Sequence, residues 1–513
     1  MDDVTTNNAH DMLEIPSLII SLFLSVFAFR AIFFLYNSRK YYLESRYLAQ
    51  QPAPRSASII NASDKSNRIN TVTEYAYCNY YDSVRNPFHA KKVSLENCEL
   101  DDNLNSNVPE IGSTQSPEYI LNPVISLIIA TNNEESVIGT LLNSLEKLTY
   151  NPMRFEIIIV DDSTDATIQI LEERKKRMQN LRVIKGKMTG SKGAALNLAI
   201  KNLRHDTSWV IILDADVILP PDIIEQFLDI LSNSKRMCDA IQGYCIPYNN
   251  GIYQNGESKN WVSRGVEFRL ALRNRIEFVA RDKLHLPVQI TGSLFMIKNS
   301  ILQKTGFSTD LCEDWDLTLQ LYIRENDTNN TQNKNNSELS TSNIHFSERL
   351  NAWNQSPTSF SSYFMQRLRV AEGHTRGFIK MIPRLLECKQ SIIKKLEIFL
   401  TGFQYLKYTL ILFLIILDLV ALESLDSIIY NTYWLTSFSI QLFCISTLII
   451  TNILGVVICN RNKHYGVKDF LSKLFLDICT LPALILGSSL GILRDKGVFY
   501  RTKRIVGNGQ LTQ

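Results

Sequence analysis

Four short apolar runs that end in polar residues constrain the fold of this chain more than any other feature. They are "VISLIIA" (124–130), "FEIIIVDDS" (155–163), "LRVIKG" (181–186) and "WVIILDADV" (209–217), and helical stretches such as 134–148 and 165–178 lie between them. Alternating strands and helices of this kind build a mostly parallel sheet that is covered by helices on both faces. The sequence therefore predicts an α/β fold for residues 123–380.

Acidic side chains gather where these predicted strands end. Asp161 and Asp162 close the second run, and Asp214 and Asp216 stand one residue apart at the end of the fourth. In open α/β sheets, ligands bind beyond the carboxyl ends of the strands. Two carboxylates at positions i and i+2 of an extended segment point the same way, so a cation between them is expected. Few protein ligands and hard oxygen donors suit Mg²⁺ or Mn²⁺, with substrate phosphates completing the shell. A solvated turn with helix-capping acids is the alternative.

Three further motifs favour the binding site over the solvated turn. "GSKGAALN" (190–197) opens a helix with small residues around Lys192, and a lysine at a helix N-terminus suits a diphosphate. "CEDWDLTLQL" (312–321) places Glu313 and Asp314 at the start of another helix. "QRLRV" (366–370) carries two arginines two residues apart.

The order of these motifs, from 124 to 374, resembles family 2 glycosyltransferases with the GT-A fold. Together with the apolar segments below, it is similar to the membrane-embedded branch that includes cellulose, chitin, hyaluronan and mannan synthases and ceramide glucosyltransferase. The resemblance implies a UDP- or GDP-sugar donor, Mn²⁺ or Mg²⁺, inversion at the anomeric carbon, and a saccharide or lipid acceptor. It covers about half of the chain.

The resemblance also implies a role for each matched position. Asp314 would be the general base, with Glu313 beside it. The metal would be held by Asp216, more directly, and by Asp214. The implied donor-nucleotide residues are Asn133, Glu134, Asp161, Asp162, Lys192, Asn197 and Asp214. The implied acceptor and diphosphate residues are Gly292, Ser293, Gln366 and Arg369. "FYRTKR" (499–504) resembles a gating segment through Phe499, Thr502 and Arg504, although a basic tail that binds anionic lipids is an equal alternative.

Two departures from the family pattern bear on the acceptor. Cys312 replaces the usual threonine, a change between small residues that we expect to be mild. Val370 replaces the family tryptophan, which in the resemblance stacks on the acceptor sugar. The loss of this aromatic platform makes a polysaccharide acceptor less favoured and a lipid acceptor more favoured.

Long apolar segments predict a multi-pass membrane protein. Residues 17–36 are long enough to span a bilayer, as are 401–422 and 434–459. Acidic residues precede the first segment and basic residues follow it, which places the catalytic domain in the cytoplasm. Arg30, the single charge in this segment, is expected to snorkel. Segment 470–493 is expected to be interrupted at Pro482 and has basic residues on both sides. We therefore favour a re-entrant or interfacial segment with both flanks in the cytoplasm, and a membrane span is the alternative.

These observations predict an anchor at 1–36, a polar linker at 37–122, a catalytic domain at 123–380 with a disordered Asn-rich insertion at 326–343, interfacial and membrane helices at 381–493, and a basic tail at 494–513. The expected function is transfer of a sugar to a growing β-linked polysaccharide. The alternatives are a single transfer to a membrane lipid and a catalytically silent scaffold, and a homo-oligomer or partner subunit is possible. The net charge of +3 gives no reason to expect nucleic acid, and the nine scattered cysteines fit reduced thiols.

Overall fold

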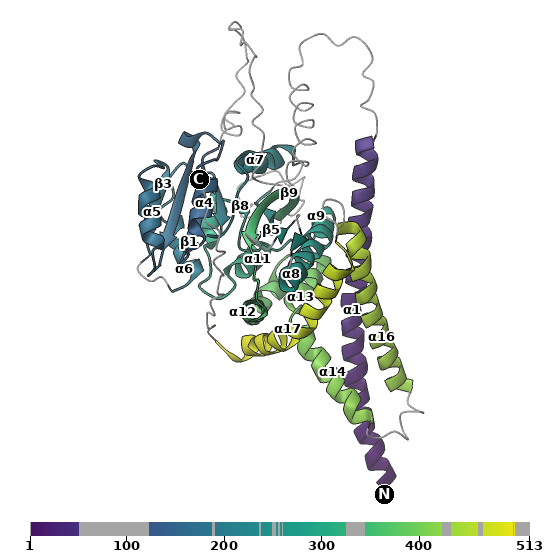
Figure 1. Cartoon of the computed structure of the whole chain (residues 1–513). Coiled ribbons are helices and arrows are strands. Elements are labelled where there is room, and N and C mark those ends of the chain that lie inside the picture. Colours follow the sequence, from purple (N-terminus) through teal and green to yellow (C-terminus); the bar gives the residue numbers. More distant parts are fainter. Residues whose placement is uncertain are drawn as a thin grey trace, which may run out of the picture.

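The computed structural model describes residues 2–50, 123–186, 190–234, 238–248, 253–254, 257–258, 260–324, 344–422, 432–459, 465–495 and 497. The predicted linker beyond residue 50, the Asn-rich insertion at 326–343, and Phe499, Thr502 and Arg504 lie outside these residues. A sheet domain stands beside a group of long helices, of which α1 (Asp2–Gln50) is the longest (Figure 1).

A seven-stranded sheet forms the centre of the first part, in the order β3-β2-β1-β4-β8-β5-β9. Its strands are β1 (Ile125–Thr131), β2 (Phe155–Asp161), β3 (Leu181–Lys185), β4 (Trp209–Leu213), β5 (Ala240–Tyr248), β8 (Phe295–Lys298) and β9 (Ile344–Gln355). Strand β8 runs antiparallel to β4 and β5, and the other pairs are parallel. A separate small hairpin joins β6 (Tyr253–Gln254) to β7 (Glu257–Ser258).

Both faces of the sheet are buried, which explains why its central strands are continuous apolar runs. Leu127 and Ile129 of β1 pack into one apolar cluster with α4 (Ile138–Leu145), α5 (Thr167–Lys175) and α7 (Ile223–Asn233). Ile128 faces the opposite cluster, with α6 (Lys192–Ile200), α10 (Asn299–Thr305) and α11 (Glu313–Ile323). The short η1 (Pro152–Arg154) precedes β2. The predicted α/β architecture is confirmed.

Helices between the sheet and the apolar region connect the two parts of the molecule. Helix α8 (Trp261–Leu272) continues into the π-helical η2 (Arg273–Phe278) and α9 (Val279–Lys283). Helix α12 (Phe360–Glu387) packs extensively against α17 (Val467–Leu493) and also touches α11. Because α12 contacts both, it links the sheet domain directly to the apolar helices (Figure 1).

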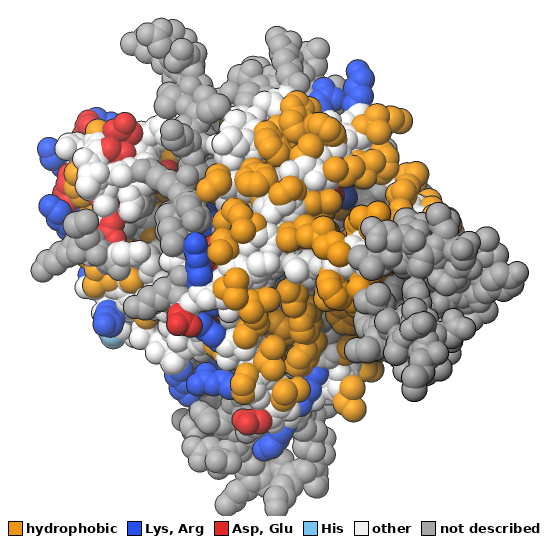
Figure 2. All heavy atoms as spheres, turned by 90° about the horizontal axis from the view of Figure 1, so that it is seen from below, with side chains coloured by type: hydrophobic (Ala, Val, Ile, Leu, Met, Phe, Trp, Pro, Cys, Tyr) orange, Lys and Arg blue, Asp and Glu red, His pale blue; other side chains and the backbone are white. Residues whose placement is uncertain are grey.

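The apolar segments form helices, as predicted. Three are long and apolar enough to cross a membrane: Ser17–Leu43 within α1, Leu435–Cys459 within α16 (Thr432–Cys459), and α17. A fourth is possible if α13 (Ile392–Gly402) and α14 (Leu406–Leu422) form one span bent by 68°. Seen from below, hydrophobic side chains gather into a broad patch with basic side chains at its margins (Figure 2). Exposed Leu and Phe side chains on these helices account for such a surface.

Two details differ from the sequence-based expectation. Helix α1 continues past the predicted anchor boundary at residue 36 and ends at Gln50. Helix α17 runs unbroken through Pro482, at which we expected an interruption. Proline inside a helix removes one backbone hydrogen bond but does not have to end the helix when neighbouring elements pack around it.

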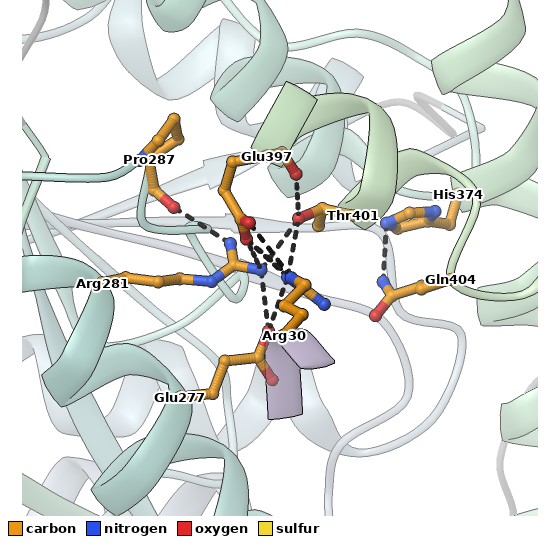
Figure 3. A network of polar contacts seen from close by, with 8 residues as sticks. All are labelled: Arg30, Glu277, Arg281, Pro287, His374, Glu397, Thr401 and Gln404. Carbon is orange, nitrogen blue, oxygen red and sulfur yellow. Dashed lines mark hydrogen bonds and ion pairs between the residues drawn. The ribbon is translucent and has the colours of Figure 1, made fainter. Parts of the chain in front are cut away.

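Arg30 of α1 does not snorkel to the helix end as expected, because it lies in a buried polar network (Figure 3). Its guanidinium contacts the carboxylate of Glu397 on α13 at 2.6 Å and that of Glu277 on η2 at 3.3 Å. Arg281, with a side chain only 2% exposed, contacts the same two carboxylates at 2.9 and 2.7 Å. Two arginines and two glutamates thus join α1, α13 and the η2–α9 segment.

Candidate active site

A large cavity of about 2700 Å³ begins at the carboxyl ends of β1, β2 and β4 and reaches the apolar helices. Most of the predicted site residues line this cavity, namely Asn133, Glu134, Asp162, Lys192, Asp214, Asp216, Gly292, Ser293, Glu313, Asp314, Gln366 and Arg369. These residues come from loops and helix starts separated by more than 200 positions in the sequence. The fold therefore collects them on one edge of the sheet.

Lys192 is the central cation of this edge. Ser191 caps helix α6 by accepting a hydrogen bond from the Ala194 amide, which sets Lys192 in the first turn. The Lys192 ammonium lies 2.6 Å from Asp214 Oδ1 and 3.1 Å from Glu313 Oε1. Burial works against the charged ammonium, but these carboxylates outweigh it and raise the pKa of Lys192. Lys192 is therefore a permanent positive charge at the sheet edge.

The turn at Gly292 brings the lysine and the predicted base together. Gly292 has a φ of +79°, and its carbonyl accepts a hydrogen bond from Lys192 at 3.0 Å. A Cβ atom at this position would stand 3.2 Å from Asp314 Oδ2. The next residue, Ser293, accepts a hydrogen bond from the Asp214 amide at 2.9 Å. Both the positive φ and the close approach of Asp314 therefore favour glycine at this position.

Asp314 lies in the first turn of α11 and faces the cavity. Its Oδ1 atom accepts a hydrogen bond from the Trp315 amide at 2.8 Å. Burial and the neighbouring Glu313 carboxylate raise the pKa of Asp314 to about 7, although Lys192 acts in the opposite direction. A carboxyl group with a pKa near neutrality is well matched to accept a proton at physiological pH.

Asp214 and Asp216 have the chemistry of a site for a hard divalent ion. Among the described residues, no three His, Cys, Asp or Glu side chains form a cluster that would hold a metal without other ligands. Asp214 is already engaged by Lys192, whereas Asp216 is buried at the cavity wall. Two carboxylates beside an open cavity fit Mg²⁺ or Mn²⁺, which keep water and phosphate oxygens in their shells.

Two predicted nucleotide residues do not line the cavity. Asp161 points to the other side of the strand end from Asp162, and it accepts hydrogen bonds from Thr131 (2.7 Å) and Ser163 (2.5 Å). Asn197 exchanges two hydrogen bonds of 2.8 Å with the backbone of Phe307. Period-two alternation explains the first case, since consecutive side chains of a strand face opposite ways. Both residues hold neighbouring loops in place.

Helix α12 closes the cavity opposite the sheet edge. Gln366 and Arg369 line it, as does Val370. Gly373 allows α12 to approach the start of α11, because a Cβ there would stand 2.7 Å from Cys312 Sγ. This close approach brings "CED" and "QRLRV", which are more than 50 residues apart in the sequence, to one site.

The sequence does not indicate the aromatic contacts behind the base. Trp315 stacks on His374 with ring centroids 4.1 Å apart, and His374 meets Tyr405 edge-on at 5.0 Å. Burial and nearby Arg367 lower the pKa of His374 to about 3, so this imidazole is neutral. His374 hydrogen-bonds Gln404 at 2.8 Å (Figure 3), which fits a structural role.

Comparison with known proteins agrees with this geometry. Residues 126–304 match the family model described as Glycosyl transferase family 2. A probable glycosyltransferase of Sulfolobus acidocaldarius is 26% identical over 55% of this chain and 56% of its own length, so the chain spans little more than half of that relative. A poly-beta-1,6-N-acetyl-D-glucosamine synthase of Staphylococcus epidermidis is 23% identical over 69% of this chain and 78% of the relative. A beta-monoglucosyldiacylglycerol synthase of Synechocystis is 36% identical over 20% of this chain and 22% of the relative.

The matched residues contain the sheet strands β1 to β5 and β8 together with Lys192, Asp214, Asp216 and the Gly292 turn. The motifs on which the sequence resemblance rested thus fall within the family match or, like Asp314 and Arg369, directly beside it in space. Residues 126–304 of this chain therefore match glycosyltransferase family 2.

Proposed function

We propose that the chain transfers a sugar from a UDP- or GDP-sugar, with inversion, in a reaction that depends on Mg²⁺ or Mn²⁺. One observation carries this proposal. Lys192, Asp214, Asp216 and Asp314 come from three separate segments and line the same cavity at the sheet edge. A cation, a pair of carboxylates and a carboxyl group with a pKa near 7 are the groups that this reaction needs.

In the proposed mechanism, Asp314 accepts the proton of an acceptor hydroxyl as that oxygen attacks the anomeric carbon. The bond from that carbon to the diphosphate oxygen breaks at the same time, so a single displacement inverts the configuration. Asp216 and Asp214 would hold the divalent ion, which neutralises charge on the leaving diphosphate. Lys192 and Arg369 add fixed positive charge near the same group, and Asp162 binds the nucleoside.

The acceptor has two candidates. A growing β-linked polysaccharide is supported by the similarity to the poly-beta-1,6-N-acetyl-D-glucosamine synthase. A membrane lipid is supported by the cavity itself, which continues from Asp314 to apolar side chains of α14 and α16 such as Ile411 and Ile445. Val370 lies where the resemblance implies an aromatic platform for a sugar, which also favours the lipid. We further propose that the catalytic domain faces the cytoplasm, where nucleotide sugars are available.

The test uses the full chain in detergent with Mn²⁺ and a panel of UDP- and GDP-sugars, following release of nucleoside diphosphate. Asp314→Asn should lower release by about 10²- to 10⁴-fold, the usual contribution of a general base. Asp229→Asn, the same change on the exposed face of α7, is the matched control and should leave release unchanged. No release with any donor, together with no metal-dependent nucleotide binding, would refute the enzyme and leave a catalytically silent scaffold. Product size then separates polymer from glycolipid.

A further inference from the structure

Three arginines line the part of the cavity that lies between the sheet edge and the apolar helices. Arg269 belongs to α8, Arg273 to η2, and Arg367 to α12. They gather around Tyr405: the Arg367 guanidinium lies 5.2 Å from the ring centroid, and both other arginines interact electrostatically with this tyrosine. We call these three residues the arginine cluster.

Within the part of the chain that the structure describes, no carboxylate makes an ion pair with the arginine cluster. Arg269 donates to the Tyr363 hydroxyl at 2.6 Å. Arg273 lies over the Phe278 ring at 5.4 Å, and its Nε atom is buried without a partner. Arg367 is 8% exposed, and both its Nε and one terminal nitrogen are buried without partners.

The nearest acidic groups are already engaged. Glu277 contacts Arg30 and Arg281, as described above. Asp477 of α17 attracts Arg269 and Arg367 from a distance, but it is bound to Lys473 at 2.8 Å. The remaining field is therefore positive, and burial together with Arg269 lowers the pKa of Arg273.

Two other buried arginines among the described residues have carboxylate partners. Arg281 contacts two glutamates, and Arg376 contacts Glu372 at 2.5 Å and Asp310 at 2.8 Å. An unpaired buried charge is strongly unfavourable, and proteins normally supply a counter-charge. Arg273 and Arg367 have buried nitrogen atoms without a partner and no carboxylate of the described residues beside them, and both line the cavity, which indicates that the counter-charge is a ligand.

The diphosphate of the donor is not the best candidate for this ligand. Gln366 and Arg369 are three residues apart on α12 and share a face, whereas Arg367 is rotated by roughly 200° from Arg369. The arginine cluster instead adjoins Tyr405 at the base of α14, from which Tyr408, Ile411 and other side chains continue the cavity between apolar helices. An anion held here would be attached to a group that lies among apolar side chains.

The arginine cluster is also close to the predicted base through side-chain contacts. Trp315, the residue after Asp314, stacks on His374, which contacts Tyr405, over which Arg367 lies. This chain of ring contacts connects the arginine cluster to the residue that follows the predicted base, and both line the same cavity.

We propose that the arginine cluster binds the phosphate of a membrane lipid and that a hydroxyl group of this phosphate-bearing lipid is the acceptor. The hydroxyl oxygen bonds to the anomeric carbon, its proton passes to Asp314, and the nucleoside diphosphate leaves. The proposal rests on the proposed function and specifies its acceptor class. A neutral saccharide chain would leave three guanidinium groups without a counter-charge, whereas a phosphate accepts several N–H donors at once and matches arginine geometry.

Binding is measured on the purified full chain with dioctanoyl phosphatidic acid, dioctanoylglycerol and inorganic phosphate as probes. We expect the phosphatidic acid to bind at least tenfold more tightly than the other two. Arg273→Gln and Arg367→Gln should each lower that affinity about tenfold or more, and Arg349→Gln on the exposed edge of β9 should not change it. Equal binding of the two lipids would overturn the proposal. Binding of inorganic phosphate as tight as that of the lipid would overturn the lipid part.

Thermal stability gives a second readout that a purely structural role would not produce. If the arginine cluster lacks its counter-charge in the absence of lipid, Arg273→Met should raise the Tm of the lipid-free protein. Phosphatidic acid should raise the Tm of the wild type but not that of the variant. A lower Tm for the lipid-free variant would overturn the proposal. Nucleotide binding is measured in parallel: weaker UDP or GDP binding in Arg273→Gln would assign the cluster to the donor instead. Nucleoside diphosphate release without a lipid preference would overturn this proposal while preserving the proposed function.

Discussion

The pKa of Asp314 makes a prediction about the pH dependence of catalysis. The carboxyl group must be ionised to accept a proton, and its pKa is about 7 rather than the usual 3.8. The value of kcat/KM should therefore be half-maximal near pH 7, level off about one pH unit above it, and fall tenfold per pH unit well below it. At pH 6 the enzyme should retain about a tenth of its maximal kcat/KM, because the profile of this parameter reports the free enzyme.

Removing the charge of Glu313 or of Lys192 should change the pH at which kcat/KM becomes half-maximal. We call the fall of kcat/KM at low pH the acid limb. Glu313→Gln removes a neighbouring negative charge, so the pKa of Asp314 should fall. Two unit charges roughly 6 Å apart interact by about 3 kcal/mol at an effective dielectric of 20, and 1.36 kcal/mol is one pKa unit, which predicts a shift of about 1 to 2 pH units toward acid. Lys192→Gln removes a positive charge and should shift the limb toward alkaline pH.

The assay is nucleoside diphosphate release between pH 5 and 9 at low donor concentration, with saturating metal. Glu173→Gln is the matched control for Glu313→Gln, because Glu173 is exposed on α5 and far from the cavity. Shifts of the same sign in the two site variants would refute the assignment. So would an unchanged limb in Glu313→Gln, which would mean that the group titrating near pH 7 is not Asp314.

Three further predictions concern packing and the identity of the titrating group. Glu397→Gln should lower the free energy of unfolding by about 3 kcal/mol, because it leaves two buried guanidinium groups with the single carboxylate of Glu277. Glu172→Gln at an exposed pair should change the free energy of unfolding by less than about 1 kcal/mol, as checked by thermal unfolding in detergent. Gly292→Ala should lower kcat more than tenfold while nucleotide binding is largely retained, because the added methyl group meets Asp314 at 3.2 Å; fast turnover in this variant would contradict the geometry. His374→Gln should leave the position of the pH limb unchanged, because the pKa of His374 is about 3; a shifted limb would assign it to the imidazole.

The sheet and most of the residues that line the cavity at the strand ends could be predicted from the sequence, because both follow from local patterns. A buried parallel strand must be apolar throughout, and its polar residues can only appear where it ends, so Asp162, Asp214 and Asp216 marked the site. The same reasoning could not predict that Asp162 lines the cavity whereas Asp161 does not. Which of two neighbouring acids faces the cavity depends on where the strand alternation stops, and that is set by the Thr131 and Ser163 hydroxyls that bind Asp161.

Long-range polar contacts account for what the sequence did not reveal. The sequence predicted that the Arg30 side chain would snorkel to the membrane surface. Its partners Glu277 and Glu397 could not be anticipated, because they lie more than 240 residues away in the sequence. The arginine cluster was missed for a related reason. Nothing near Arg269, Arg273 or Arg367 in the sequence shows that each will be buried without a carboxylate.

The Arg30 network and the arginine cluster are coupled through a single element. Glu277 lies one helical turn after Arg273 in η2; it lines the cavity and also binds Arg30 of α1 and Arg281. A buried charge network has one favourable arrangement and strongly unfavourable alternatives, so it fixes the position of η2 relative to the membrane helices. Because η2 also carries Arg273, the contact that attaches the catalytic domain to α1 also determines where the proposed lipid phosphate would be held. Loss of Glu397 should therefore weaken phosphatidic acid binding as well as stability, even though Glu397 does not line the cavity.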